Sequence, residues 1–460
     1  MIPKRVMGVE TEYGLTSATT TGEPSILTGE EAAQLLFRKV VEWGRSTNTF
    51  LSNGSRLYLD VGAHPEYASA ECVSIDDLVA LDRAGDLIYQ SMVDEANASL
   101  EEQSSTERLH LIKNNVDSAG NSYGCHENYL LRRRRDFRSR VDSLVPFFVT
   151  RQVLTGAGHI RRQPDGASFE LSQRADQMWD AISSASTRSR PIVNTRDEPH
   201  GDMEKYRRMH VIVGDTNMSQ TTTALKFAMT EMLLVLLEDG VIMPHLKLAD
   251  PMKAIRNISH DITLKTKVEL EEGGSRTALE IQREFAELAH SHYDSHGYKS
   301  ELDATRLMLA NLWLEGIDAL EKGELEKLST KLDWVAKLNL LDRYRTKAGT
   351  GWDDPRLARL ELAYHDISPT SGLFTTMTNQ GLLDRLVTEE TAQHFTSNAP
   401  TTTRAALRGR FVKAATEARR DYMVDWMNLR LLEADGARTV ILKDPFSPVD
   451  DRVDELLEHV

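Results

Sequence analysis

The sequence predicts an α+β protein, because strand-like and helical patterns both recur along the chain. Residues 7–12 have the composition of a strand, and residues 56–61 alternate polar and apolar side chains with the period of two that a strand requires. Residues 221–238 have the length and apolar content of a buried helix, and Gly240 follows as a residue that ends it. We therefore expect helices and strands to share one core.

Local signals predict a first helix after the opening strand. Thr28 and Glu31 have the spacing of a capping box, which satisfies free N–H groups at a helix start. Leu36, Val40 and Trp43 follow at intervals that place them on one helical face. This face is expected to pack on the core.

A turn at Asn53-Gly54 precedes the alternating strand, and Ser74 with Asp77 is predicted to cap a second helix. Its buried stripe would consist of Leu78, Leu81, Ile88 and Met92. Further strand-like runs occur at residues 109–113, 127–131 and 209–213.

The second half of the chain is predominantly helical. Residues 279–345 combine many leucines with many charged side chains, as is typical of solvated helices on a core. Residues 398–403 have the composition of a linker, and a shorter mixed segment follows them. We therefore place a domain boundary near residue 395, which divides the chain into a large domain (1–395) and a small C-terminal domain (396–460).

Composition excludes several classes of protein. The 460 residues carry a formal net charge of −15, which opposes nucleic acid as the main partner because phosphate binding needs a basic face. Two cysteines cannot make a disulfide framework, so a reducing cytoplasm is expected. The N-terminus lacks the apolar core of a signal peptide, and no apolar stretch has the length of a membrane span, so we expect no membrane insertion.

Familiar nucleotide-binding motifs are absent: the chain has no GxxxxGK[ST], no GxGxxG after a strand and no kinase catalytic loop. If ATP binds, carboxylates and a metal must hold it. Glu10 and Glu12 lie two residues apart on a predicted strand, so both carboxylates face the same side. Oxygen ligands of this kind suit Mg²⁺, which binds protein carboxylates and substrate phosphates at the same time. The alternative for these two residues is a solvent-facing strand edge.

The strand at 56–61 offers a second chemical face. Arg56, Tyr58 and Asp60 share one side, while the intervening residues are apolar. Glu66 and Ser69 follow shortly after it. A purely structural surface strand, the competing interpretation, rarely collects a cation, a phenol, two carboxylates and a hydroxyl.

A small and polar loop at 114–124 leads into the strand-like run that contains His126 and Glu127, and such a loop lets backbone approach a ligand. A hairpin turn is the alternative, and it is favoured on composition alone. An HExxH zinc motif is excluded because position 130 is Leu. Several arginines are candidates for phosphate or carboxylate recognition, or else for a scattered basic surface: Arg188, Arg190, Arg196, Arg207 and Arg208. The run 132–135 is interpreted as a solvated strand end.

Five segments together resemble the Pup–protein ligase family, also called proteasome accessory factor A. They read GVETEYG, NGSRLYLDVGAHPEYASAE, NNVDSAGNSYGCHENYL, TRSRPIVNTRDEPH and HVIVGDTNMS. The resemblance extends over essentially the whole chain and implies a glutamine synthetase-like fold, with a curved, mainly antiparallel sheet backed by helices. It also implies ATP- and Mg²⁺-dependent ligation of the C-terminal glutamate side chain of Pup to lysines of target proteins through a γ-glutamyl phosphate, which marks them for the proteasome.

The resemblance also implies roles for particular residues. The implied magnesium ligands are Glu10, Tyr58 and Glu66; the implied ATP contacts are Arg56, Ser69 and Trp426; and the implied proton acceptor is Asp60. Position 69 is expected to be Thr as readily as Ser in the family, and either residue supplies the hydroxyl. By analogy with glutamine synthetase, Glu12 and His210 are candidates for a further metal.

Three other functions compete with this interpretation. A depupylase or deamidase of the same family hydrolyses the bond, but it carries a long insertion after the first helix, where this chain has only a short connection from Trp43 to Asn53. A glutamate–cysteine-type ligase would share the acyl-phosphate chemistry without explaining the whole-chain resemblance. A non-catalytic adaptor would not need a metal face.

Overall fold

The computed structural model describes residues 1–460 apart from 43–45, 61, 118–119, 165, 185–189 and 435. Its largest sheet has eight strands in the order β10-β11-β12-β7-β1-β5-β4-β3 within this described part, and β1 lies near the middle. Among these described strands, β10 and β11 are the one parallel pair. The expected α+β fold with a mainly antiparallel sheet is therefore confirmed. The sheet strands are β1 (Met7–Glu12), β3 (Asn48–Phe50), β4 (Arg56–Asp60), β5 (His64–Ala68), β7 (Cys125–Arg132), β10 (Asp180–Ser183), β11 (Pro191–Asn194) and β12 (Tyr206–Val211).

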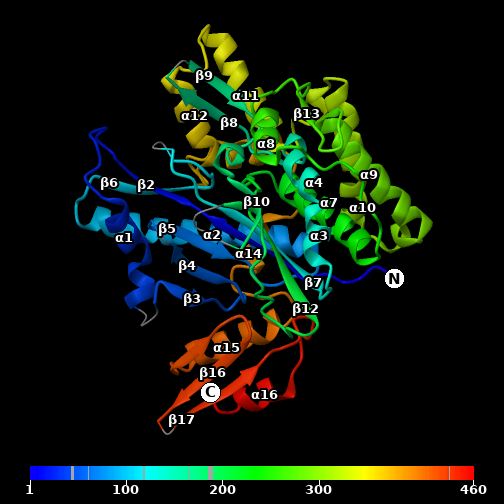
Figure 1. Ribbon diagram of the computed structural model, residues 1–460. Coiled ribbons are helices and arrows are strands. Elements are labelled where there is room, and N and C mark those ends of the chain that lie inside the picture. Colours follow the sequence, from blue (N-terminus) through cyan, green and yellow to red (C-terminus); the bar gives the residue numbers. More distant parts are fainter. Residues whose placement is uncertain (43–45, 61, 118–119, 165, 185–189, 435) are drawn as a thin grey trace.

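Helices cover one face of this sheet, where α2 packs on β1 and α7 packs on β7 (Figure 1). Alternate residues of the central strands, including Val9, Tyr129 and Met209, enter the core with the apolar side of α7. The helices are α1 (Gly29–Glu42), α2 (Ile75–Glu102), α3 (Phe137–Asp142), α4 (Val145–Thr150), α5 (Gln152–Thr155), α7 (Gln220–Glu238), α8 (Pro251–Ser259), α9 (Ala278–Ser295), α10 (Ala304–Glu321), α11 (Asp333–Ala348), α12 (Pro355–His365), α13 (Leu373–Asn379) and α14 (Glu389–His394).

Among the described residues, three small antiparallel ribbons complete the N-terminal part. They are β2 (Gly14–Thr19) with β6 (Glu107–Ile112), β8 (His159–Gln163) with β9 (Gly166–Glu170), and β13 (Lys267–Glu269) with β14 (Ser275–Thr277). Short 3-10 turns occupy Ala175–Gln177, Tyr298–Glu301 and Leu325–Lys327.

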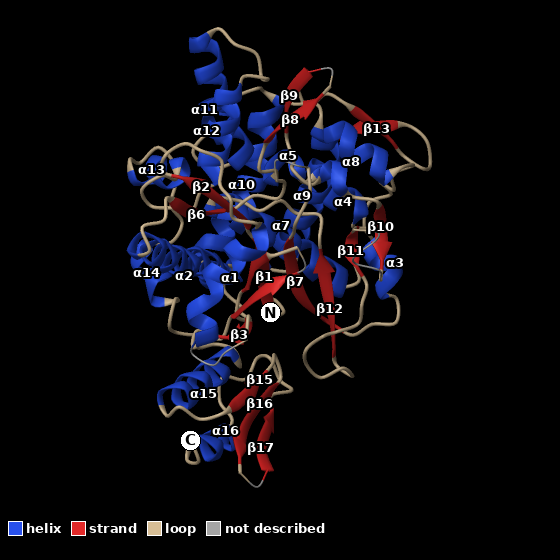
Figure 2. Ribbon diagram, turned by 90° about the vertical axis from the view of Figure 1, so that its left-hand side faces the viewer, coloured by secondary structure: helices blue, strands red, loops and turns tan. Residues whose placement is uncertain are grey.

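The elements after residue 404 lie together at one end of the molecule (Figures 1 and 2). They are α15 (Ala405–Glu417), β15 (Tyr422–Val424), β16 (Asn428–Glu433), β17 (Gly436–Ile441) and α16 (Asp451–Leu457). Leu407 and Phe411 on α15 pack with Leu429 and Leu431 on β16 in a separate hydrophobic core. The boundary near residue 395 remains a prediction.

The helix-start signals in the sequence are confirmed. Thr28 Oγ1 accepts a hydrogen bond from the Glu31 amide at 3.2 Å, and the Glu31 carboxylate accepts one from the Thr28 amide at 2.8 Å. Ser74 caps α2 by accepting from the Asp77 amide. On α1, Leu36 is buried as expected, whereas Trp43 lies outside the described residues.

The hairpin turn expected within residues 114–124 is confirmed, because Val116 and Ser122 form an antiparallel bridge and the Tyr123 amide donates to the Asn115 carbonyl at 3.1 Å. The strands β6 and β7 on its two sides do not pair with each other, however. β6 pairs with β2, and β7 pairs with β1 and β12, so the loop joins strands of two different sheets. Asn115 anchors the loop, because its side chain donates to Thr216 Oγ1 at 2.8 Å and accepts from the Thr216 amide at 2.6 Å. The loop thus fixes where β7 begins, next to β1.

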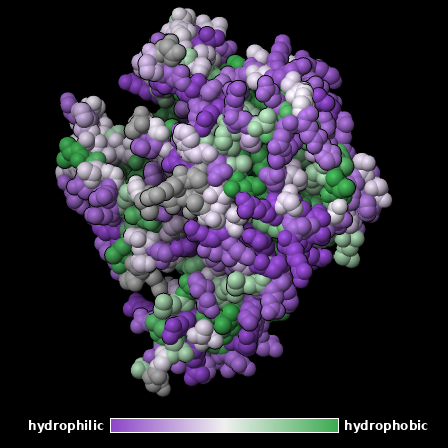
Figure 3. All heavy atoms as spheres, in the orientation of Figure 1, coloured by the Kyte–Doolittle hydropathy of each residue, from purple (hydrophilic) through white to green (hydrophobic). Residues whose placement is uncertain are grey.

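None of the described helices is long and apolar enough to cross a membrane. The face of the molecule seen in Figure 3 is mostly hydrophilic, with hydrophobic residues in small separate areas.

Candidate active site

The register of the central strands gathers carboxylates on the face of the sheet away from the helices. Glu12 on β1 is opposite Glu66 on β5, and Tyr58 on β4 is opposite the same Glu66. On the other side of β1, Glu10 is opposite His126 on β7. Because side chains alternate along a strand, these residues all project to the same face. The shared face predicted for Glu10 and Glu12 is confirmed, and so is the one predicted for Arg56, Tyr58 and Asp60.

Glu10 lies at the centre of a polar cluster. Its Oε2 is 3.1 Å from Nδ1 of His126, and its Oε1 accepts a hydrogen bond from the Asn128 amide group at 3.0 Å. Nε2 of His210 lies 3.7 Å from Oε2. Burial raises the pKa of Glu10, but His126 and His210 outweigh it and hold the pKa well below its ordinary value. Glu10 is therefore an anion at neutral pH.

Glu66 has the opposite electrostatic character. Its carboxylate accepts a hydrogen bond from the Tyr58 hydroxyl, and only 2% of the residue is exposed. Burial, together with the negative charges of Glu10 and Glu12, raises the pKa of Glu66 well above its ordinary value. Burial and the negative charges of Glu10 and Glu66 also raise the pKa of the Tyr58 hydroxyl. Three carboxylates that repel one another in a buried place indicate a site where a cation would relieve the repulsion.

Ligand-type atoms converge in two adjoining groups on this face. One consists of Glu10, His126 and His210, the other of Glu12, Glu66 and His126, and within each group the ligand atoms lie within 4.8 Å of one another. Neither ring nitrogen of His210 makes a hydrogen bond within the described part of the chain, although the residue is buried. An unsatisfied imidazole beside a carboxylate fits a metal-binding role.

Of the three predicted magnesium ligands, two lie in contact with each other and the third lies in the neighbouring group. Tyr58 and Glu66 are in direct contact, and Glu10 lies on the next strand in the other group. His126, which belongs to both groups, was not a candidate from the sequence. The local sequence His126-Glu127-Asn128 does not have the spacing of a metal-binding motif. The residues that could bind a metal together with His126 lie on other strands.

A pocket with about 560 Å³ of empty space adjoins Glu10. Two of the predicted ATP contacts line it: Ser69, which follows β5, and Trp426, which lies between β15 and β16. Apolar side chains of Val6, Leu130 and Pro445 contribute to the lining. A ligand with an aromatic ring and an anionic end would fit this pocket if a cation lay between its anionic end and the carboxylates.

Ser69 and Trp426 are both held in place. Ser69 Oγ accepts a hydrogen bond from the Val9 amide at 3.0 Å, which ties it to β1. The Trp426 ring packs edge-on against Phe50 with a centroid distance of 5.0 Å. Trp426 comes to the pocket from the C-terminal elements, so the two parts of the chain build the pocket jointly.

Arg56 and Asp60 lie farther along the same face, on β4. The Arg56 guanidinium stacks on the Tyr58 ring at 4.4 Å, and its Nε donates to Asn48 Oδ1 at 2.8 Å. Arg56 is not among the described residues that line the pocket. Asp60 is exposed at the end of β4, opposite His64. An exposed carboxylate next to the buried cluster is accessible from solvent.

The arginine candidates divide between the two sides of the sheet. Arg208 on β12 lies on the carboxylate side, with Nη1 4.0 Å from Glu10 and 3.2 Å from Asn128 Oδ1. Arg207 lies over the Phe137 ring at 4.1 Å, on the other side. Arg188 is outside the described residues, and Arg196 is exposed. Of the run 132–135, Arg132, Arg134 and Arg135 are exposed, as predicted for a solvated strand end.

The chain has close relatives. The family model described as Pup-ligase protein matches residues 5–430. A Pup–protein ligase of Xylanimonas cellulosilytica is 52% identical over 458 residues, which cover 99% of this chain and all of that protein. A Pup–protein ligase of Sanguibacter keddieii is 51% identical over 460 residues, covering both chains completely.

Solved structures agree with these sequence matches. The ligase PafA in a crystal structure of its complex with the prokaryotic ubiquitin-like protein Pup superimposes with a TM-score of 0.93 at 41% identity, covering 99% of this chain and 91% of the other. The Pup ligase PafA in complex with ADP superimposes with a TM-score of 0.85 at 41% identity, covering 95% and 94%.

Proposed function

Because the chain belongs to the Pup-ligase family, we infer that it is an ATP-dependent Pup–protein ligase. It joins the side-chain carboxylate of the C-terminal glutamate of Pup to lysine amines of target proteins, which marks them for proteasomal degradation. The observation that carries this function is the carboxylate face of β1, β4 and β5 beside a pocket lined by Ser69 and Trp426. A non-catalytic adaptor would not need such a face.

Ligation requires that the Pup carboxylate be activated, since a carboxylate is a poor electrophile. The γ-phosphoryl group of ATP passes to the carboxylate oxygen, which gives a γ-glutamyl phosphate and ADP. The lysine nitrogen then attacks the acyl carbon, phosphate leaves, and one proton is released. The phosphoryl transfer spreads negative charge over several oxygens, so it needs positive charge near it.

Mg²⁺ is the cation that we assign to this site, with Glu10, Tyr58 and Glu66 as the residues that would hold it. When bound, it would neutralise the phosphate oxygens and orient them. The donors fit, because they are oxygen atoms and two are carboxylates. The unsatisfied ring of His210 supports a ligand group with Glu10 and His126, whereas Glu12 belongs to the other group, with Glu66 and His126.

The nucleotide occupies, in this proposal, the pocket beside Glu10. Ser69 and Trp426 would contact it there, and their places in the lining support that assignment. Arg56 lies on the same sheet face and would reach the nucleotide from β4. The phosphates would then lie toward the carboxylates and the base toward the apolar wall.

Asp60 is the proton acceptor in this proposal. A free lysine is protonated at neutral pH, and transfer of its proton to an unperturbed aspartate would cost about 9 kcal/mol. The carboxylate must therefore take the proton as the nitrogen attacks, or after desolvation of the amine. The exposure of Asp60 at the end of β4 supports access by a lysine on a folded target. The cytoplasmic location, expected because Cys72 and Cys125 form no disulfide framework, is part of the same proposal.

The test is to incubate the protein with Pup ending in glutamate, ATP, Mg²⁺ and a lysine-bearing acceptor, and to analyse the products by mass spectrometry. An isopeptide-linked conjugate should form, and it should require each component. A parallel incubation with Pup ending in glutamine examines the hydrolytic alternative. Rapid conversion of that glutamine to glutamate with no conjugate would assign the chain to the deamidase function instead.

A further inference from the structure

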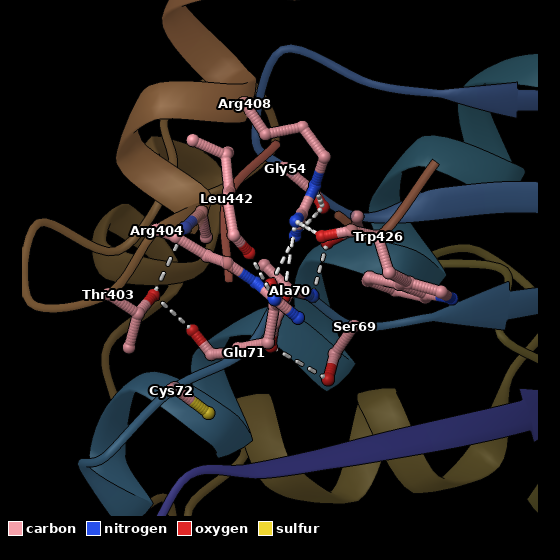
Figure 4. A network of polar contacts seen from close by, with 12 residues as sticks. Gly54, Ser69, Ala70, Glu71, Cys72, Thr403, Arg404, Arg408, Trp426 and Leu442 are labelled. Carbon is pink, nitrogen blue, oxygen red and sulfur yellow. Dashed lines mark hydrogen bonds and ion pairs between the residues drawn. The ribbon is translucent and has the colours of Figure 1, made fainter. Parts of the chain in front are cut away.

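A buried arginine on α15 connects the C-terminal elements to the sheet. Arg408 has no exposed surface, and its guanidinium lies over the Trp426 ring at 4.9 Å (Figure 4). It also contacts Glu71, which follows β5, and Gly54, which lies in the turn before β4. Gly54, the most distant of these partners along the chain, is 354 residues from Arg408.

All five N–H donors of Arg408 are used. Nε and Nη2 donate to the Gly54 carbonyl at 3.0 and 2.8 Å, and Nη1 donates to the Trp426 carbonyl and to Glu71 Oε1, each at 3.1 Å. Nη2 also donates to Glu71 Oε2. The planar, forked shape of a guanidinium allows this pattern, whereas a lysine ammonium has three donors on one atom.

The partners of Arg408 coincide with the proposed nucleotide contacts. Gly54 is two residues before Arg56, and Glu71 is two residues after Ser69. The third partner is Trp426 itself. Each proposed ATP contact therefore either bonds to the Arg408 guanidinium itself or lies two residues from a residue that does. Gly54 has a φ of +78°, and an added Cβ would lie 3.1 Å from Ala405, so α15 lies directly against this turn.

Arg404, one turn before Arg408, strengthens the connection. Its Nε donates to Glu71 Oε1 at 2.8 Å, and its Nη1 donates to the Leu442 carbonyl at 2.8 Å. Glu71 and Arg404 both line the pocket. Figure 4 shows the carboxylate of Glu71 between the two arginines, with Ser69 and Trp426 on the same side.

We propose that Arg408 is a positioning residue for nucleotide binding, which holds the segments that carry Arg56, Ser69 and Trp426 in one arrangement. This inference rests on the proposed nucleotide pocket. A merely structural ion cluster would stabilise the fold without setting the affinity for ATP. Arg408 instead sets the affinity for ATP, because it holds the three segments in place. Other residues bind Pup and carry out the chemical step.

The test compares Arg408→Met and Arg408→Lys with the parent in steady-state ligation. The KM for ATP should rise by about 10- to 100-fold in Arg408→Met, the range expected when hydrogen bonds to charged groups are lost. The turnover number at saturating ATP and the KM for Pup should change far less. Arg408→Lys should not restore the ATP affinity, because lysine cannot bond to all three segments. ADP affinity, measured by calorimetry, should fall in parallel.

The matched control is Arg410→Met, two residues away on the same helix. Arg410 is exposed and pairs with Asp454 at 2.8 Å, so its loss should leave the KM for ATP unchanged. If Arg408→Met does not fold, Glu71→Gln serves in its place, because it keeps the shape and removes the charge that Arg408 binds; it should raise the KM for ATP in the same direction. Lowered melting temperatures with an unchanged KM for ATP in the folded variants would overturn the proposal.

Trp426→Ala separates this inference from the proposed function on which it rests. If Trp426→Ala weakens ATP binding and the Arg408 variants do not, the positioning role is refuted while the pocket assignment stands. If Trp426→Ala leaves ATP binding unchanged, the pocket assignment itself is wrong.

Discussion

Nδ1 of His126 lies 3.1 Å from Oε2 of Glu10, and the two residues are directly opposite each other in the pairing of β7 with β1. An imidazole that contacts a metal-binding carboxylate orients it and raises its metal affinity. The other ring nitrogen of His126, Nε2, faces Glu12 and lies 4.0 Å from its Oε1. His126 thus links the two groups of potential metal ligands.

Replacing His126 by Ala should therefore weaken metal binding. We expect the Mg²⁺ concentration for half-maximal ATP turnover to rise by about 10- to 100-fold, as is typical when such an orienting contact is lost. His459→Ala, an exposed histidine near the C-terminus, is the control. An unchanged Mg²⁺ dependence in folded His126→Ala would remove His126 from the site.

Glu10→Gln removes the negative charge that we propose to hold Mg²⁺, without changing the size of the side chain. Mg²⁺-dependent ATP turnover should fall by orders of magnitude, because the phosphoryl transfer loses the positive charge that it requires. Circular dichroism should show that the fold survives, and Glu23→Gln at an exposed position should retain activity. Normal turnover in a folded Glu10→Gln protein would refute the metal assignment.

Asp60→Asn keeps the shape of the side chain but cannot accept a proton. Lysine ligation should fall by about 10²–10⁴-fold, the usual contribution of general-base catalysis, while ATP affinity stays near that of the parent. Asp60→Ala should be no better. If ATP binding fell in parallel with ligation, Asp60 would instead have a structural role; near-normal ligation would exclude it as the base.

The Glu71 cluster predicts a pH dependence of stability. Burial raises the pKa of Glu71, but Arg408 and Arg404 outweigh it and lower the pKa to about 2, from an ordinary value of 4.5. The folded pKa is below the unfolded one, so this contribution is complete above pH 4.5 and is lost as the pH falls toward 2. It amounts to about 3 kcal/mol, of which about 2 kcal/mol is lost by pH 3.

Denaturant unfolding of the parent and of Glu71→Gln at several pH values measures this contribution. Glutamine does not titrate, so the difference in unfolding free energy between the two proteins should shrink as the medium becomes more acidic. A difference that stays constant from neutral pH to pH 3 would show that the Glu71 carboxylate is not stabilised by the two arginines.

Local patterns in the sequence predicted the local features of the fold. The alternation of Arg56, Tyr58 and Asp60 with apolar residues fixed which side chains share a face, because a strand has a period of two. The caps of α1 and α2 depend on residues three positions apart, so they too could be predicted from the sequence. By contrast, the partners of β6 and β7 are distant strands, and a turn-like composition at 114–124 cannot reveal them.

The parts of the site that depend on distant contacts were not predictable in this way. His126 meets Glu10 across 116 residues of sequence, and no local motif marks it as a ligand. Arg408 meets Glu71 across 337 residues, in a helix whose pattern is that of an ordinary core helix. The predicted roles of Ser69 and Trp426 came from family resemblance, whereas Glu10 was a metal candidate from its spacing with Glu12 as well. The structure adds where these residues lie relative to one another.

Isotope transfer tests most directly whether ATP activates the Pup carboxylate. Pup whose C-terminal γ-carboxylate carries ¹⁸O is ligated to an acceptor lysine, and the released phosphate is examined by mass spectrometry. A γ-glutamyl phosphate passes one carboxylate oxygen to phosphate, so each isopeptide bond should yield one ¹⁸O-labelled phosphate. Unlabelled phosphate accompanying normal conjugate formation would contradict activation by phosphoryl transfer.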